Sequence, residues 1–186
     1  MEESELIQHI RHVWKHADCL FDEKSVERAI LRLSDQITED YATANPVFLC
    51  LMKGAVVFMG RLLTKLPFPL EIDYIHASRY GDKTKGATLQ WSHQPSEFLI
   101  RGRHIVLVDD IFDQGVTLEA CVKWLLNHGA LSVEAAVLVE KDHDRVMTDF
   151  RPKYIGLTVP DTFVVGFGMD YKNYFRNANG IFRIAP

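Results

Sequence analysis

Two hydrophobic patterns alternate along this chain. Residues 4–15 and 22–41 repeat their apolar positions with the period of a helix. Short apolar runs, long enough for buried strands of a parallel sheet, occupy residues 47–52, 69–77, 105–108, 132–139 and 154–159. Further helices are predicted after the first and third of these runs, through about residues 66 and 127. Strands that alternate with helices predict an α/β fold, a mostly parallel twisted sheet flanked by helices.

The first predicted helix carries several histidines. Ser4 is a candidate N-cap, and His9, His12 and His16 follow at helical spacing. Histidines four positions apart share a helix face and can bind a metal ion. A solvated helix face explains the same spacing and is favoured, because no matching acidic or cysteine ligand is evident.

Composition restricts the classes of partner. A length of 186 residues with 47% hydrophobic residues fits a single domain over residues 1–186 with a substantial core. The net charge of −4 and the pI near 6.0 give no general attraction to nucleic acid or to an anionic membrane. We therefore expect neither partner, and any binding of anions must be local.

The cysteines and the N-terminus suggest a cytoplasmic protein. The three cysteines, Cys19, Cys50 and Cys121, are odd in number and unevenly spaced, which fits reduced thiols in the cytosol. The acidic N-terminus is not followed by a signal peptide. The longest apolar stretch, residues 46–60, is interrupted by Lys53 and is too short to span a bilayer.

Residues 104–118 combine an apolar run with the chemistry of an anion site. Asp109 and Asp110 are predicted at the carboxyl end of a buried strand, the edge where open α/β sheets bind ligands. Gly115 permits a tight loop, and the free amides of the next helix, with the hydroxyl of Thr117, suit a phosphate monoester. Asp113 would repel phosphate, so it either faces another part of a substrate or caps the helix.

A second strand, glycine and helix arrangement occurs at Lys53 and Gly54. Free amides at the start of the following helix again favour an anion. A plain turn with an exposed lysine is the alternative.

The segment 104–118 closely resembles the phosphoribosyl-pyrophosphate signature of the type I phosphoribosyltransferases: an apolar strand, two acidic residues, two apolar residues and a loop ending in Gly-x-Thr. An aspartate at position 113 resembles the sequence of the branch of the family that uses 6-oxopurines. In that branch this carboxylate approaches N7 of the base. Gln114 and Val116 depart from the family, which more often has Thr or Ser at the first position and a variable residue, often Lys, at the second. The resemblance implies that residues 113–117 bind the phosphoribosyl group.

Other segments carry the same resemblance. Lys53 and Gly54 resemble the pyrophosphate loop, where the peptide before the glycine is often cis. The polar residues 78–94 resemble the family's mobile lid, with Ser78, Arg79 and Tyr80 nearest to its Ser-Tyr pair; a surface hairpin is the alternative. Lys141 resembles the lysine that recognises the 6-oxo group, although residues 140–144 also fit a solvated charge run, in which His143 receives no role.

The C-terminal part resembles the family's hood, formed here by the N-terminal segment and about residues 160–186. Phe163 would stack on the purine, Val164 would offer its backbone to the base edge, and Met169 would line the other side. Asp170 would bind a second metal ion or the 2-amino edge. Arg176 resembles a pyrophosphate-binding arginine. A core aromatic and a surface cation are the structural alternatives for Phe163 and Arg176.

The resemblance implies an enzyme of purine salvage that transfers the phosphoribosyl group from phosphoribosyl pyrophosphate to hypoxanthine or guanine. Asp113 would be the general base, Mg²⁺ would be the cofactor, and its ligands would be Asp109, Asp110 and Asp170. A homodimer or homotetramer is implied. A preference for xanthine or for hypoxanthine alone stays open, as does a non-catalytic regulator that binds nucleotide or RNA. A pyrimidine salvage enzyme conflicts with the hood around Phe163.

Overall fold

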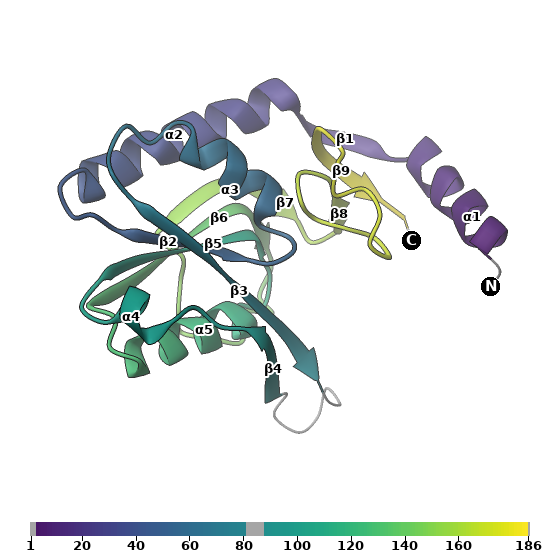
Figure 1. Cartoon of the computed structure of the whole chain (residues 1–186). Coiled ribbons are helices and arrows are strands. Elements are labelled where there is room, and N and C mark those ends of the chain that lie inside the picture. Colours follow the sequence, from purple (N-terminus) through teal and green to yellow (C-terminus); the bar gives the residue numbers. More distant parts are fainter. Residues whose placement is uncertain (1–2, 81–87, 186) are drawn as a thin grey trace.

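The main sheet crosses the middle of the molecule. The computed structural model describes residues 3–80 and 88–185. Within them, five strands pair in parallel, in the spatial order β3 (Glu71–Tyr80), β2 (Val47–Leu51), β5 (His104–Phe112), β6 (Ser132–Asp142) and β7 (Tyr154–Pro160). An antiparallel strand, β4 (Thr88–His93), completes the sheet beside β3. The mostly parallel sheet predicted from the apolar runs is confirmed (Figure 1).

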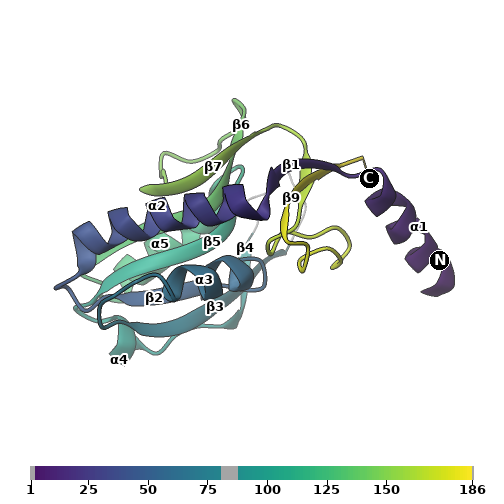
Figure 2. The same ribbon diagram turned by 90° about the horizontal axis from the view of Figure 1, so that it is seen from above.

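Helices cover both faces of this sheet. One face carries α2 (Glu23–Tyr41) and α3 (Val56–Leu63), and the other carries α5 (Val116–Asn127) and the short α4 (Glu97–Ile100) (Figures 1 and 2). Val106 and Val108 of β5 pack on the α2 and α3 side, whereas Ile105 and Leu107 pack on the α5 side. This alternation follows from the two-residue period of a strand, so a continuous apolar run feeds both cores.

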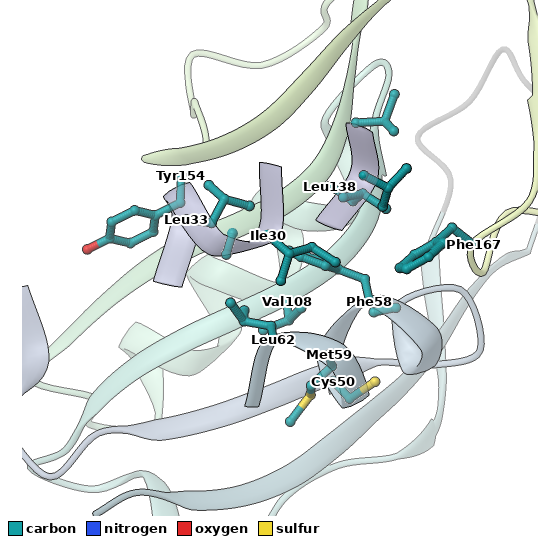
Figure 3. Close-up of a cluster of buried hydrophobic side chains, with 14 of the residues drawn as sticks. Ile30, Leu33, Cys50, Phe58, Met59, Leu62, Val108, Leu138, Tyr154 and Phe167 are labelled. Carbon is teal, nitrogen blue, oxygen red and sulfur yellow. The ribbon is translucent and has the colours of Figure 1, made fainter. Parts of the chain in front are cut away.

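The core on the α2 and α3 side extends to the segment around Phe167, which follows β8 (Phe163–Val165) in a second, smaller sheet. Figure 3 shows Ile30 and Leu33 of α2, Phe58 of α3 and Val108 of β5 in this core, with Phe167 at one end. Each of these five side chains is fully buried. The core therefore fixes the segment around Phe167 against the main sheet.

The second sheet joins the two ends of the chain. Its strands are antiparallel, in the order β1 (Asp18–Asp22), β9 (Gly180–Ile184) and β8 (Phe163–Val165). The helix α1 (Glu3–Lys15) lies beside this small sheet, away from the main sheet (Figures 1 and 2). Trp14 of α1 holds it there, with ring centroids 5.1 Å from Phe175 and 4.8 Å from Phe182.

Several predicted boundaries are wrong. The helix α1 already includes Glu3, so Ser4 lies inside the helix and is not its N-cap. The strand predicted at residues 105–108 continues to Phe112, because its pairing with β6 continues that far. Asp109 and Asp110 therefore lie in the last part of β5, and the strand continues past them to Phe112.

The polar residues 78–94 predict a loop, but part of this segment forms strands. The backbone of residues 78–80 belongs to β3 and pairs with residues 88–90 of β4; residues 81–87 lie outside the described part of the chain. Hairpin pairing uses backbone groups, so polar side chains do not prevent it.

All three cysteines are free, as expected. Among the described helices, none combines the length and the apolar composition that a bilayer crossing requires.

Candidate active site

A cavity of about 430 Å³ opens where β2, β5 and β6 end, between the main sheet and the small sheet. Open α/β sheets bind ligands at this edge because the loops after parallel strands meet there. Most of the predicted site residues line it: Gly54, Asp109, Asp110, Asp113, Gln114, Gly115, Thr117, Lys141, Phe163, Val164, Met169, Asp170 and Arg176.

Some predicted site residues do not line the cavity. Lys53 is exposed just after β2, and Val116 is the first residue of α5. The predicted lid falls largely outside the described part of the chain: the backbone of residues 78–80 ends β3, but the side chains of Ser78, Arg79 and Tyr80 are not described. The lid therefore stays a prediction.

Asp109 and Asp110 place two carboxylates in a poorly solvated position at the end of β5. The backbone N–H of Asp110 donates to Oδ1 of Asp109 at 2.9 Å. Burial raises the pKa of Asp109 well above its ordinary value, and the charge of Asp110 raises it further. Burial also raises the pKa of Asp110, although a hydrogen bond with Asp109 and the positive charge of Arg176 oppose this shift. A cation bound here would relieve the repulsion within the pair.

The loop after β2 touches both the carboxylate pair and the small sheet. A β-carbon at Gly54 would come 2.1 Å from Oδ2 of Asp110, so any other residue there would force the Asp110 carboxylate to move. The cis peptide bond of this loop joins Met52 and Lys53, one position earlier than the family resemblance predicts.

The loop of residues 113–117 has the backbone that its glycine suggests. Gly115 has φ +79° immediately before α5, and a β-carbon there would come 2.3 Å from Cγ2 of Thr148. Asp113 does not cap the helix, because Gly115 occupies the N-cap position without a side-chain cap. The capping alternative for Asp113 is therefore wrong.

Asp113 instead contacts Lys141, near the end of β6, and His143, the first residue after that strand. Nζ of Lys141 lies 3.2 Å from its Oδ2, and Nε2 of His143 lies 2.6 Å from its Oδ1. Burial raises the pKa of Asp113, but the hydrogen bonds from His143 and Lys141 outweigh this effect and hold the pKa below its ordinary value.

His143 is the residue that sequence reasoning missed. Lys141 lies in β6 and His143 directly follows that strand, so the two are two positions apart. Strand side chains at this spacing share a face. That spacing was the available signal. The acidic residues between and around them obscured it, because they suggest a solvated charge run.

The small sheet supplies the opposite wall of the cavity. Phe163 is 42% exposed, so it is not a core aromatic, and its ring meets Tyr171 edge-on with centroids 5.6 Å apart. The hydroxyl of Tyr171 lies 3.0 Å from Nε2 of His9 in α1. Val164 and Met169 are buried beside this exposed ring. The exposed face of Phe163 thus offers a flat apolar surface to a ligand.

Arg176 spans the loop between β8 and β9. Its Nη1 donates to the carbonyl oxygen of Gly168 at 2.6 Å, and its Nη2 pairs with Oδ1 of Asp170 at 2.6 Å. The other oxygen of Asp170 accepts the backbone N–H of Asn173 at 2.7 Å. These bonds hold Asp170 in the small sheet's loop.

Metal binding is predicted at the aspartates of the cavity and considered for the histidines of the first helix. In the part of the chain that the structure describes, no three His, Cys, Asp or Glu side chains gather as a metal site, either around Asp170 or among the histidines of α1. Asp109 and Asp110 together can still supply hard oxygen ligands. This fits Mg²⁺, which usually binds one or two carboxylates together with substrate phosphates and water.

Comparisons with known proteins agree with this geometry. The family described as the phosphoribosyl transferase domain matches residues 16–172. The hypoxanthine-guanine phosphoribosyltransferase of Streptococcus pneumoniae strain R6 is 34% identical over 158 residues, which cover 85% of this chain and 87% of that protein. The enzyme of the same name from Bacillus subtilis is 30% identical over the same share of this chain.

Solved structures show the same fold. A hypoxanthine phosphoribosyltransferase of Staphylococcus aureus superposes with a TM-score of 0.84 at 29% identity, and 91% of each chain is covered. A hypoxanthine-guanine phosphoribosyltransferase of Bacillus anthracis gives a TM-score of 0.84 at 28% identity, covering 90% of this chain and 98% of the other. The chain therefore belongs to the type I phosphoribosyltransferase family, in the group of the hypoxanthine-guanine phosphoribosyltransferases.

Proposed function

We propose that this protein transfers the 5-phosphoribosyl group from phosphoribosyl pyrophosphate to hypoxanthine or guanine, giving inosine or guanosine monophosphate and pyrophosphate. The observation that carries the proposal is the meeting of Asp113 and Lys141 in one cavity, opposite the exposed ring of Phe163. A carboxylate, an ammonium donor and a flat apolar surface together complement the edge and face of a 6-oxopurine.

The base would lie between the small sheet and the end of β6. Phe163 stacks on its face, with Val164 and Met169 around it. Lys141 donates to the 6-oxo group, and a 6-amino base would present a donor to this donor. Asp113 accepts or shares the proton of N7 as N9 forms the new bond.

The donor would lie across the carboxylate pair. The backbone amides of residues 113–117, with Gln114 and Thr117, hold the 5-phosphate, and Asp109 and Asp110 hold the ribose hydroxyls. Gly54, with Arg176 and Lys53 nearby, faces the pyrophosphate. Positive charge develops on the ribose as pyrophosphate leaves, and the paired carboxylates stabilise it.

Mg²⁺ is the cofactor that this donor set fits. When bound, it neutralises the pyrophosphate charge and supports its departure. Asp109 and Asp110 would hold it together with oxygens of the donor. Asp170 is ion-paired with Arg176. We therefore assign Asp170 either to the edge of the base that carries the 2-position or to orienting Arg176 toward the pyrophosphate.

An assay of the purified protein tests the function. With Mg²⁺ and phosphoribosyl pyrophosphate, we expect absorbance changes with hypoxanthine or guanine and none with adenine. Asp113→Asn should lower the rate by roughly 10²-fold. Asp35→Asn is a control, because Asp35 is exposed on α2 and does not line the cavity.

Other outcomes would revise the proposal in defined ways. A relative from Tritrichomonas foetus is named a hypoxanthine-guanine-xanthine phosphoribosyltransferase, so xanthine belongs in the assay. Conversion without any effect of Asp113→Asn would retain the reaction and remove the role of Asp113. Failure with every base, together with tight nucleotide binding, would favour the non-catalytic regulator.

We also propose a cytoplasmic homodimer or homotetramer. The free cysteines Cys19, Cys50 and Cys121 support a reducing compartment. Light scattering after size-exclusion chromatography would give the mass, and a monomer would contradict the proposed assembly.

A further inference from the structure

His143 is held against Asp113, which lines the cavity, by contacts on both nitrogens of its ring. Nε2 lies 2.6 Å from Oδ1 of Asp113, and Nδ1 accepts the backbone N–H of Arg145 at 3.0 Å. The side chain of His143 is only 5% exposed. It is therefore a built part of the site and not a solvated member of a charge run.

These contacts define which nitrogen carries the proton. A backbone amide can only donate, so Nδ1 of His143 must be the acceptor and carries no hydrogen. The proton of the neutral ring therefore lies on Nε2 and is donated to Asp113. Because Nδ1 is already occupied by the amide, the ring has no free nitrogen through which to pass a proton onward. Its geometry suits holding the carboxylate, and not relaying a proton.

The segment that carries His143 is also fixed to the loop of residues 113–117, which we call the phosphate loop because it is proposed to bind the 5-phosphate. The backbone N–H of Met147 donates to the carbonyl oxygen of Gln114 at 3.0 Å. Thr148 is buried and lies over Gly115. On its other side, the guanidinium of Arg145 pairs with Asp161 at 2.5 Å, just before β8. His143 thus belongs to a strap, residues 143–148, that bridges the phosphate loop and the small sheet.

We propose that His143 is a positioning residue for the transfer reaction: it binds one oxygen of Asp113 so that the other oxygen, beside Lys141, faces the five-membered ring of the purine. The inference rests on the proposed function. It assigns a role to a residue outside the set expected from sequence. With Nε2 of His143 on Oδ1 and Nζ of Lys141 beside Oδ2, the two contacts restrict rotation of the carboxylate. The second oxygen is therefore already oriented when N7 of the base arrives.

The pH at which Asp113 loses its proton should depend on the hydrogen bond from His143. The charged groups around Asp113 come from several elements. Lys141 and His143 contact it directly, and Asp109 and Asp110 of β5 line the same cavity. The guanidinium of Arg145 pairs instead with Asp161. A lost donor to a carboxylate raises its pKa. The acid limb of the pH profile of kcat/KM should therefore move to higher pH when the hydrogen bond from His143 is removed.

The experiment compares His143→Phe with His143→Gln. Phenylalanine keeps a buried ring without nitrogen, and the amide of glutamine can donate toward the position of Nε2. His104→Phe is the matched control, because it removes another imidazole bond, from Nδ1 to Oγ of Ser132 at 2.8 Å, at the opposite end of β5. Activity with the base, the KM for phosphoribosyl pyrophosphate, the pH profile and the melting temperature are measured for each.

We expect His143→Phe to lower kcat/KM for the base by about 10- to 100-fold, the size of one hydrogen bond to a charged group. The KM for phosphoribosyl pyrophosphate should stay within about 2-fold, as for interactions that are not made to that substrate. The acid limb should move upward, and His143→Gln should recover most of the loss. His104→Phe should leave kcat/KM, the KM and the acid limb unchanged, although loss of its bond to Ser132 lowers the melting temperature. Nitrogen NMR of the wild type should show a signal, absent in His143→Phe, of a neutral imidazole protonated at Nε2.

Two results would overturn the inference while the proposed function survives. One is an active His143→Phe variant with an unmoved acid limb; the other is a ring protonated at Nδ1. Loss of activity equal in His143→Phe and His143→Gln, with a melting temperature lowered as in His104→Phe and no pH shift, would also overturn it. A wild type that converts no base would overturn the proposed function and the inference with it.

Discussion

The carbonyl oxygen of Gly54 lies against the α-carbon of Gly168, so closely that a β-carbon at position 168 would come within 1.9 Å of it. This contact joins the loop after β2 to the loop between β8 and β9. Asp110 lies against the same place, 3.7 Å from that hypothetical β-carbon. The two sheets therefore meet through backbone, directly beside the carboxylate pair.

Gly168→Ala should separate these loops. Gly168 has φ +107°, where an L side chain is strained, so the substitution combines a clash with backbone strain. We expect a loss of at least about 3 kcal/mol in the free energy of unfolding and a raised KM for phosphoribosyl pyrophosphate. Denaturant unfolding and initial rates measure these effects.

Gly60→Ala is the control for this prediction. Gly60 lies inside α3, and a β-carbon there would meet nothing within 4 Å. Alanine should therefore stabilise the protein by about 0.5 to 1 kcal/mol. Equal effects of the two substitutions would show that the contact between Gly54 and Gly168 is dispensable.

Phe163→Leu tests the stacking surface. The ring is 42% exposed, so its loss should change the melting temperature little, by an amount corresponding to about 0.5 kcal/mol or less. The KM for the purine should rise about 5- to 10-fold because leucine retains area but offers no aromatic face. Phe98→Leu is the control, since Phe98 is 95% exposed on α4. An unchanged KM in Phe163→Leu would place the base elsewhere.

Arg176→Lys tests the connection between Asp170 and Gly168. A guanidinium reaches both partners at once, and an ammonium cannot reproduce this two-pronged contact. We expect the KM for phosphoribosyl pyrophosphate to rise by about 10-fold or more. Arg101→Lys, which alters an exposed pair with Glu97 on α4, should have little effect. Similar kinetics in both variants would remove Arg176 from the pyrophosphate site.

Tyr154→Phe should make stability depend less on pH. The hydroxyl of Tyr154 donates to Oδ2 of Asp40 at 2.5 Å, and this bond, followed by that from Lys153, holds the pKa of Asp40 below its ordinary value of 3.8. A pKa lowered by folding stabilises the native state above the unfolded value. That contribution is lost as the pH falls through the folded value.

The variant should therefore lose about 1 kcal/mol of unfolding free energy at neutral pH, and the difference from wild type should shrink below about pH 4. Unfolding by denaturant across this pH range measures it, with Tyr74→Phe, an exposed tyrosine of β3, as the control. The catalytic rate should not change, because Tyr154 begins β7, away from the cavity. A constant difference at all pH values would contradict the role of Asp40.

The sequence alone predicts most of the main sheet and much of the cavity lining. Apolar runs bounded by glycine and acidic residues identify β2 and β5 and the loops after them, because strand burial and loop geometry are local properties of the chain. For this reason Asp109, Asp110, Asp113 and Gly115 could be predicted from residues 104–118. The short strands of the second sheet could not, because β1 pairs with β9, whose residues lie at the other end of the chain.

Only the tertiary structure decided which distant groups touch. Asp113 meets His143 because β5 and β6 pair in parallel in a register that brings Phe112 opposite Glu140. Gly54 meets Gly168 because the small sheet is packed against the edge of the large one. Hydrophobic period determines that a strand forms and which face it buries, whereas register and loop packing determine its partners. Those depend on contacts between residues that are far apart in the sequence.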